Sequence, residues 1–237
     1  MFFKRNKQVQ KSNSTARHLI TVQDPKAVVS EQFKTIRTNI NFSMPDKDLK
    51  SLVITSSTPG EGKSTNSANI AVVFAQSGKR VLLVDCDMRK PTAHFTFGLK
   101  NVKGLSNLLT RQNSINEVVQ DTMVQGLQII TSGLIPPNPA ELLASQTMDR
   151  LIEELTAQFD LVIFDAPPVL SVTDAQIVAN KVDGTILVVY AGKTEKENIL
   201  KSKEVLMASK ANILGVVLNH FKLEKEHFYY QYYGTEE

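Results

Sequence analysis

Unbroken apolar runs recur along this chain, separated by stretches in which apolar positions follow a helical spacing. Such runs are typical of strands buried on both faces of a parallel sheet. They predict six strands, at residues 52–55, 81–85, 127–131, 161–165, 185–190 and 213–219. Because strands and helical patterns alternate, we expect an α/β fold: one doubly wound, mainly parallel sheet flanked by helices, in which an edge strand can run antiparallel.

The helical patterns fall between these strands. Apolar residues spaced 4, 3 and 4 apart predict an amphipathic helix over residues 27–43, and its other face carries Glu31, Lys34 and Arg37, three apart. From spacing alone, that row is an ordinary solvated ion-pair face. Longer helices are predicted at 63–76, 140–159 and 195–208, with short ones near 104–109, 115–119 and after Asp174.

Both ends of the chain depart from this alternation. Residues 1–24 show little apolar periodicity and are predicted to be a mobile arm, followed by a domain at 25–224. Basic residues cluster in the arm, as expected either for a solvated segment or for weak attraction to an acidic membrane surface. Residues 225–237 form a tail that holds four of the five tyrosines of the chain, Tyr229, Tyr230, Tyr232 and Tyr233. These tyrosines fit either an aromatic edge strand or packing tail, or a flexible segment with phosphate-accepting hydroxyls.

The composition of the chain excludes only a few classes of protein. A length of 237 residues with 42% hydrophobic residues suits one domain with a sizeable core. A net charge of +3 does not indicate nucleic-acid binding, no apolar run approaches the length of a membrane span, and the N-terminus lacks the apolar core of a signal peptide. The single Cys86 excludes a disulfide within the chain and fits a reducing cytosol.

The first predicted strand leads into a phosphate-binding loop. Gly60 and Gly62 leave room for backbone N–H groups to approach a phosphate, and the following helix directs its positive end to the same place. Lys63 can reach phosphate oxygens and the Ser64 hydroxyl can bind Mg²⁺. A glycine-rich turn that merely closes a strand–helix unit is the simpler alternative. Ser57 stands where this kind of loop usually has its first glycine.

Carboxylates end two further buried strands. Asp85 and Asp87 follow one apolar run and Asp165 ends another, at the sheet edge where open α/β folds bind ligands. Residues two apart on a strand face the same side, and paired carboxylates need a cation, so we expect a metal ion, Lys63 or Arg89 nearby. A polar strand end with a helix cap is the alternative.

In combination these motifs resemble those of the bacterial tyrosine kinases (BY-kinases) of capsule and exopolysaccharide gene clusters. The resemblance runs from about residue 28 to the C-terminus, in the form of the family whose membrane modulator is a separate polypeptide. It rests on three motifs and the tyrosine-rich tail. The motifs are Walker A (Ser57-Thr-Pro-Gly-Glu-Gly-Lys-Ser-Thr65), Walker A′ (Val81-Leu-Leu-Val-Asp-Cys-Asp-Met-Arg89) and Walker B (Leu161-Val-Ile-Phe-Asp165). Members of the family can have a residue other than glycine at the position of Ser57.

The resemblance implies an ATP- and Mg²⁺-dependent tyrosine kinase that phosphorylates its own tail in trans and regulates polysaccharide synthesis and export. Catalytic roles would fall to Lys63, Asp85, Asp87 and Asp165, with Asp85 favoured over Asp87 as the base that accepts the tyrosine proton. The implied nucleotide-binding residues are Gly60, Glu61, Gly62, Lys63, Ser64, Thr65 and Asn219, and the implied metal ligands are Ser64, Asp85, Asp87 and Asp165.

The resemblance also implies partners. The row of Glu31, Lys34 and Arg37 would close a homo-oligomeric ring, although lysine replaces an arginine of the family motif and loses its planar fork. A transmembrane modulator would hold the kinase at the inner face of the cell membrane through its juxtamembrane segment, and a cognate phosphatase is expected. The alternatives are a switch ATPase of the partition or division-site class and a nucleotide-bound scaffold. Thr58 stands where that ATPase class usually has a second lysine.

Overall fold

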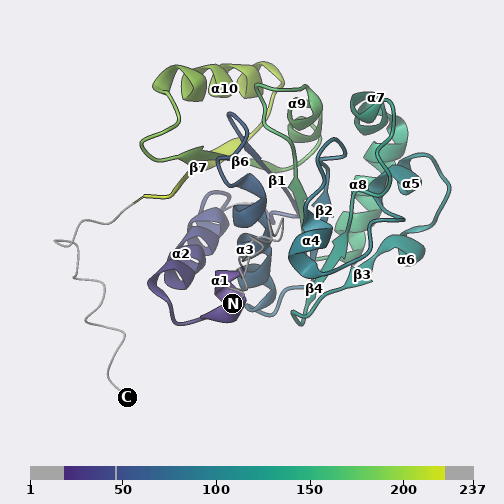
Figure 1. Ribbon diagram of the computed structural model, residues 1–237, viewed down its shortest axis with the longest axis horizontal. Coiled ribbons are helices and arrows are strands. Elements are labelled where there is room, and N and C mark those ends of the chain that lie inside the picture. The colour runs from purple at the N-terminus through teal and green to yellow at the C-terminus, as the bar shows by residue number, and fades with distance from the viewer. Residues whose placement is uncertain (1–18, 46, 222–237) are drawn as a thin grey trace, which may run out of the picture.

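The sheet at the centre of the molecule has seven strands in the order β3-β4-β2-β5-β1-β6-β7. The computed structural model describes residues 19–45 and 47–221 (Figure 1). The predicted phosphorylation sites Tyr229, Tyr230, Tyr232 and Tyr233, and the boundary between domain and tail, lie outside the described residues. The strands are β1 (Ser51–Ser56), β2 (Val81–Asp85), β3 (Gln120–Asp121), β4 (Leu127–Ile130), β5 (Leu161–Asp165), β6 (Gly184–Tyr190) and β7 (Ile213–Asn219).

The prediction of a doubly wound, mainly parallel sheet is confirmed. Every strand pair is parallel except β3–β4, a two-residue antiparallel pairing at the edge that the apolar pattern was too short to reveal. Because β1 lies between β5 and β6, its C-terminal end stands beside the end of β5 and, one strand further, that of β2. The carboxyl ends of these strands therefore meet at one edge.

Helices cover both faces of the sheet (Figure 1). One face packs against α1 (Ile20–Gln23), α2 (Val28–Phe42) and α3 (Lys63–Ala75). The opposite core includes residues from α5 (Leu105–Leu109), α7 (Pro139–Ala144), α8 (Gln146–Gln158), α9 (Asp174–Ala179) and α10 (Lys196–Ala208). The remaining short helices are α4 (Ala93–Phe97) and α6 (Ile115–Val118).

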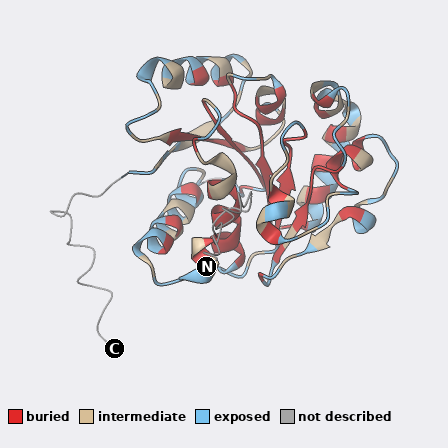
Figure 2. Ribbon diagram, viewed as in Figure 1, coloured by how far each residue is buried: buried red, intermediate tan, exposed pale blue. Residues whose placement is uncertain are grey.

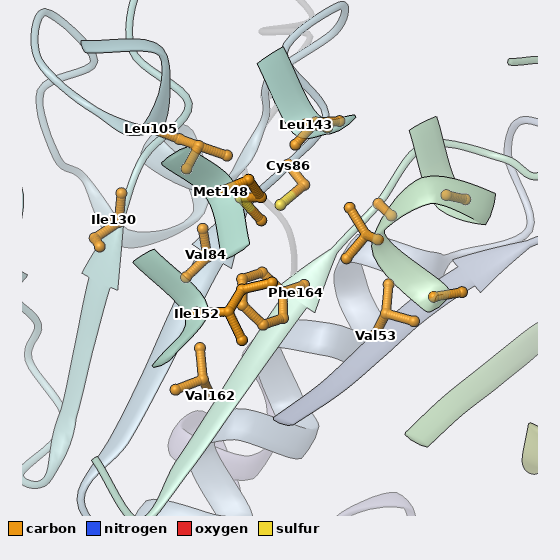
Figure 3. Packing of buried hydrophobic residues seen from close by; sticks show 14 of the residues in the cluster. Val53, Val84, Cys86, Leu105, Ile130, Leu143, Met148, Ile152, Val162 and Phe164 are labelled. Carbon is orange, nitrogen blue, oxygen red and sulfur yellow. The ribbon is translucent and has the colours of Figure 1, made fainter. Parts of the chain in front are cut away.

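Burial on both faces explains why the central strands are apolar throughout. Figure 2 shows the sheet as the most buried layer, and β1, β2 and β5 are buried along their whole length. Alternate residues of β2 enter opposite cores: Leu83 packs on the α3 side, whereas Val84 and Cys86 pack with Met148 of α8 (Figure 3). By the same alternation Asp85 is directed to the α3 side.

The helix predicted over residues 140–159 is two helices. It breaks at Ser145, whose backbone is extended and whose hydroxyl accepts a hydrogen bond from Met148 N at 3.3 Å. Serine competes for backbone groups at a helix start, so it caps α8 instead of continuing α7. Apolar spacing alone did not reveal this break because both helices bury residues at a compatible period.

Residues 19–24, predicted as part of a mobile arm, belong to the fold, and residues 1–18 lie outside the described residues. Leu19 is 4% exposed in the core beside α3, and Thr21 is fully buried. The Thr21 hydroxyl donates to Asn69 Oδ1 of α3 at 2.8 Å, and its carbonyl accepts from Gln76 at 3.0 Å. The sequence pattern missed this segment because a single helical turn is too short to show a period.

Truncating Leu19 to alanine should lower the free energy of unfolding by about 2 kcal/mol, since it removes a buried side chain and leaves a cavity against α3. Urea denaturation measures the change. Val28, at 45% exposed, supplies the control, and Val28→Ala should change stability by no more than about 0.5 kcal/mol. Equal, negligible effects of the two substitutions would show that the segment does not contribute to the core.

Candidate active site

The loop between β1 and α3 has the conformation of a phosphate-binding loop. Gly60 and Gly62 have φ angles of +84° and +92°, in the left-handed region that favours glycine. Gly62 is the residue before the first turn of α3, whose N–H groups at 63–65 have no carbonyl to bond within the helix. The loop therefore directs several backbone donors and the positive end of α3 towards one place.

Asn219, predicted as a nucleotide contact, lies against this loop from the end of β7. Its side-chain amide donates to the Glu61 carbonyl at 2.9 Å. A Cβ at position 62 would come within 2.1 Å of the Asn219 amide nitrogen, so only glycine fits there without movement. The structure thus places Asn219 beside the loop, where it helps to fix the backbone.

Glu61 is also predicted to bind nucleotide, yet its carboxylate is used within the protein. The side chain is 3% exposed and accepts hydrogen bonds from Ser57 N at 2.7 Å and Thr58 N at 3.1 Å. It also accepts from the hydroxyls of Thr58 at 2.9 Å and Thr194 at 2.7 Å. These bonds hold the start of the loop, and only the backbone of Glu61 remains to face a phosphate.

Lys63 connects the loop to the carboxylates at the strand ends. Its ammonium nitrogen lies 3.0 Å from Asp87 Oδ2 and 3.5 Å from Asp165 Oδ1. Asp85 and Asp165 are directly paired neighbours on β2 and β5. The structure therefore brings together the four residues predicted to be catalytic, Lys63, Asp85, Asp87 and Asp165.

The electrostatics of this cluster follow from burial. Burial lowers the pKa of Lys63, but the charges of Asp165, Asp87 and Asp85 outweigh it and raise that pKa. Burial first, and then the neighbouring Asp165 charge, raise the pKa of Asp85 to about 7 against the opposing effect of Lys63. A fixed cation therefore stands beside a carboxyl group that can exchange a proton near neutral pH.

Asp85 and Asp87 also shape the backbone that follows β2. Asp85 accepts N–H hydrogen bonds from Asp87 at 3.1 Å, Thr92 at 3.2 Å and Ala93 at 3.1 Å. Asp87 Oδ1 accepts from Lys90 N at 3.0 Å, while its other oxygen faces Lys63. These bonds fold the segment after β2 around its own carboxylates.

Arg89, one of the cations expected near these carboxylates, forms its ion pair with another residue. Its guanidinium forms two 3.0 Å hydrogen bonds with Asp174, a fully buried residue in the first turn of α9. The sequence placed Asp174 only at the start of a short helix and did not indicate this partner. The pair ties the segment after β2 to the connection after β5, and so fixes the segments that carry Asp87 and Asp165 relative to one another.

The donor set fits a nucleotide phosphate and fits Mg²⁺ in part. Within residues 19–45 and 47–221, no three His, Cys, Asp or Glu side chains gather closely enough to hold a metal ion by themselves. Mg²⁺, however, is commonly held by one or two carboxylates together with substrate phosphates and water. Ser64, whose hydroxyl lies 3.2 Å from Lys63 Nζ, begins α3 together with Thr65. The predicted ligands Ser64, Asp85, Asp87 and Asp165 are the oxygen donors that would hold the ion there together with phosphate and water.

The predicted oligomer row lies on α2, away from this edge. Glu31 and Lys34 form an exposed ion pair at 2.6 Å, and Arg37 donates to the carbonyl of Val73, near the C-terminal end of α3, at 2.9 Å. An arginine at this position complements the negative end of the helix. The residues of this row therefore also form contacts within a single chain, both along α2 and between α2 and α3.

The fold and this site define a P-loop nucleotide-binding protein whose strand-end carboxylates stand beside the loop lysine. A family model for the AAA domain matches residues 49–194. The chain is 52% identical to the tyrosine-protein kinase YwqD of Bacillus subtilis (strain 168) over 221 residues, which cover 93% of each chain. It is 41% identical to the tyrosine-protein kinase CpsD of Streptococcus agalactiae serotype III (strain NEM316) over 190 residues, 80% of this chain and 81% of that one. The chain belongs to the bacterial tyrosine-protein kinase family.

Solved structures agree with this assignment. The chimerical protein CapA2B2 is 43% identical, with a TM-score of 0.84 over 88% of this chain and 93% of that chain. The kinase domain of the Escherichia coli tyrosine kinase ETK is 32% identical, with a TM-score of 0.82 over 92% and 87% of the two chains. The septum site-determining protein MinD of Pyrococcus horikoshii OT3, with bound Mg-ADP, is 22% identical, with a TM-score of 0.63 over 74% and 72% of the two chains; it shares the fold alone. The protein is thus a tyrosine-protein kinase.

Proposed function

We propose that this kinase uses ATP and Mg²⁺ to phosphorylate tyrosines in its own tail in trans, and thereby regulates capsular or extracellular polysaccharide synthesis and export. The observation that carries the proposal is the position of Lys63, which begins the helix after the phosphate loop and contacts Asp87 and Asp165 at the strand ends. Phosphate recognition and proton acceptance are therefore available at one edge of the sheet.

Each residue of the cluster has a role that its contacts support. Bound Mg²⁺·ATP would supply the phosphoryl group and neutralise part of its charge. Lys63 would donate to the phosphate oxygens, for which its raised pKa keeps it protonated. Asp85, with a pKa of about 7, would take the proton from the tyrosine hydroxyl. Ser64 would bind the metal ion, and Asp87 and Asp165, together with Asp85 itself, would orient it.

The tail and the partners complete the proposal. Residues 225–237 carry the four acceptor tyrosines, and a neighbouring subunit would present them to the strand-end edge. Glu31, Lys34 and Arg37 on α2 would contribute to a ring of subunits. No helix within the described part of the chain is long and apolar enough to cross a membrane. We propose that a transmembrane modulator holds the kinase at the inner face of the membrane and that a phosphatase reverses the modification.

The contacts of Thr58 support a kinase over a switch ATPase of the partition or division-site class. Members of that class usually carry a second lysine at this position. Here the Thr58 backbone N–H and hydroxyl both bond to Glu61, inside the loop. This position is therefore part of the internal support of the loop and supplies no second phosphate-binding cation.

Incubation with Mg²⁺ and ATP, with and without the juxtamembrane segment of a candidate modulator, tests the proposed function. We expect phosphotyrosine that mass spectrometry maps to Tyr229, Tyr230, Tyr232 and Tyr233. A chain with these four residues changed to phenylalanine is the control, and it should lose the signal while retaining ATP binding. ATP hydrolysis without phosphotyrosine would contradict the kinase proposal and favour a switch ATPase, whereas binding alone would favour a scaffold.

A further inference from the structure

Thr194, which no motif singles out, supports the nucleotide loop from a different part of the chain. It lies in the connection between β6 and α10, and its hydroxyl donates to Glu61 Oε1 at 2.7 Å. The same hydroxyl accepts the N–H of Tyr190, the last residue of β6, at 2.8 Å. One donated and one accepted hydrogen bond fix the hydroxyl between the end of β6 and the loop.

The carboxylate of Glu61 connects Thr194 to the loop backbone through further hydrogen bonds. Its second oxygen, Oε2, accepts the N–H groups of Ser57 and Thr58, the first two residues of the loop. With Thr58 and Thr194 on Oε1, the carboxylate accepts four hydrogen bonds while almost fully buried. A buried carboxylate requires such donors, and one that loses a donor can recover it only by moving. The orientation of Glu61, and with it the start of the loop, therefore depends on Thr194.

Asn219 contacts the same residue at its backbone. Its amide donates to the Glu61 carbonyl at 2.9 Å from the end of β7. Two neighbouring strands thus hold Glu61, β6 through Thr194 at the carboxylate and β7 through Asn219 at the carbonyl. The loop that they hold carries Gly60 and Gly62, whose conformational freedom would otherwise allow many arrangements of the N–H groups.

We propose that Thr194 is a positioning residue for the nucleotide loop and acts through Glu61. A nucleotide binds tightly only to the fraction of molecules whose loop already directs its N–H groups at the phosphates, so loosening the loop raises the apparent Kd in proportion. Thr194 acts indirectly and does not itself contact a phosphate. The inference rests on the proposed use of ATP, and it adds a residue outside the family's motifs to the nucleotide site.

The test is titration of the full chain with ATP in the presence of Mg²⁺. Thr194→Val keeps the shape of the side chain but removes the hydroxyl, and it should raise the Kd for ATP about three- to tenfold, the size of the net contribution of one typical intramolecular hydrogen bond. Thr194→Ser restores the hydroxyl and should stay within about twofold of wild type. The thermal midpoint of each variant is measured alongside to separate loop positioning from global stability.

Thr185 provides a matched control within β6. Its hydroxyl is buried and has no hydrogen-bond partner within the described residues. Thr185→Val is therefore the same chemical change, in the strand that leads to Thr194, without a lost hydrogen bond, and it should leave both the Kd for ATP and the thermal midpoint no worse than in wild type. An equal rise in Kd for the two valine variants would overturn the inference.

A double-mutant cycle with Glu61→Gln tests whether Thr194 acts through Glu61. If it does, Thr194→Val should change the Kd much less in the Glu61→Gln background than in wild type. Full additivity would overturn the inference, as would an unchanged Kd in Thr194→Val alone. Should the valine variant not fold, Thr194→Ala takes its place in the same cycle. A wild-type chain that binds no ATP would instead contradict the proposed function itself.

Discussion

Lys63→Met is expected to lower the rate of phosphotyrosine formation by about a thousandfold or more. Removing one well-placed group that stabilises transferring-phosphoryl or oxyanion charge costs roughly two to five orders of magnitude in comparable enzymes. Here Lys63 is the cation within 3.5 Å of both Asp87 and Asp165, so its loss leaves phosphate and carboxylate charges facing one another. Single-turnover phosphorylation, read with an anti-phosphotyrosine probe, measures the effect.

The fold should survive this substitution. Asp85 has a pKa of about 7 and can take up a proton when the neighbouring cation is lost, which relieves the unpaired negative charge. Lys79→Met is the control: this lysine lies past the end of α3, where its ammonium sits 5.5 Å from the Phe74 ring centroid. We expect that variant to phosphorylate within about twofold of wild type, because it alters no contact of the site. A Lys63→Met protein with more than a tenth of normal activity would exclude Lys63 from a role in phosphoryl transfer.

Phosphorylation of the tail is expected to dissociate the proposed ring. Each phosphate adds about −1.5 to −2 charge, so four in this short segment add very roughly −6 to −8. The strand-end edge already carries Asp85, Asp87 and Asp165, all buried, and would repel such a tail. A ring held together by tail insertion should therefore separate into smaller species.

Size-exclusion chromatography with light scattering, before and after treatment with a tyrosine phosphatase, tests this expectation. The dephosphorylated protein should assemble and the phosphorylated protein should not. A chain with the four tail tyrosines changed to phenylalanine should stay assembled in the presence of Mg²⁺ and ATP. Identical sizes for the phosphorylated and dephosphorylated chains would rule out charge-driven dissociation.

Much of the fold was predictable because the burial of a strand is visible in its own sequence as a run of apolar residues. All six predicted strands are present in the structure. The central strands β1, β2 and β5 are buried on both faces, whereas the edge strand β7 is apolar although Val216 and Leu218 are exposed. The misses are elements too short to show a period. They are the two-residue strand β3, the single turn α1, the five-residue helix α4 and the Ser145 break between α7 and α8. Here hydrogen bonds to distant or capping residues decide the structure, and a local pattern does not record them.

The sequence by itself predicted which residues make up the site. The loop glycines, Lys63 and the three strand-end aspartates identify a phosphate site with carboxylates, because close approach to phosphate requires glycine and parallel strands end at one edge. Only the tertiary structure decided how these groups are used. It turned the Glu61 carboxylate inward to Thr194, paired Arg89 with Asp174 instead of Asp87, and gave Arg37 a partner on α3. These contacts join residues 36 to 133 positions apart, and only the folded chain brings them within hydrogen-bond distance.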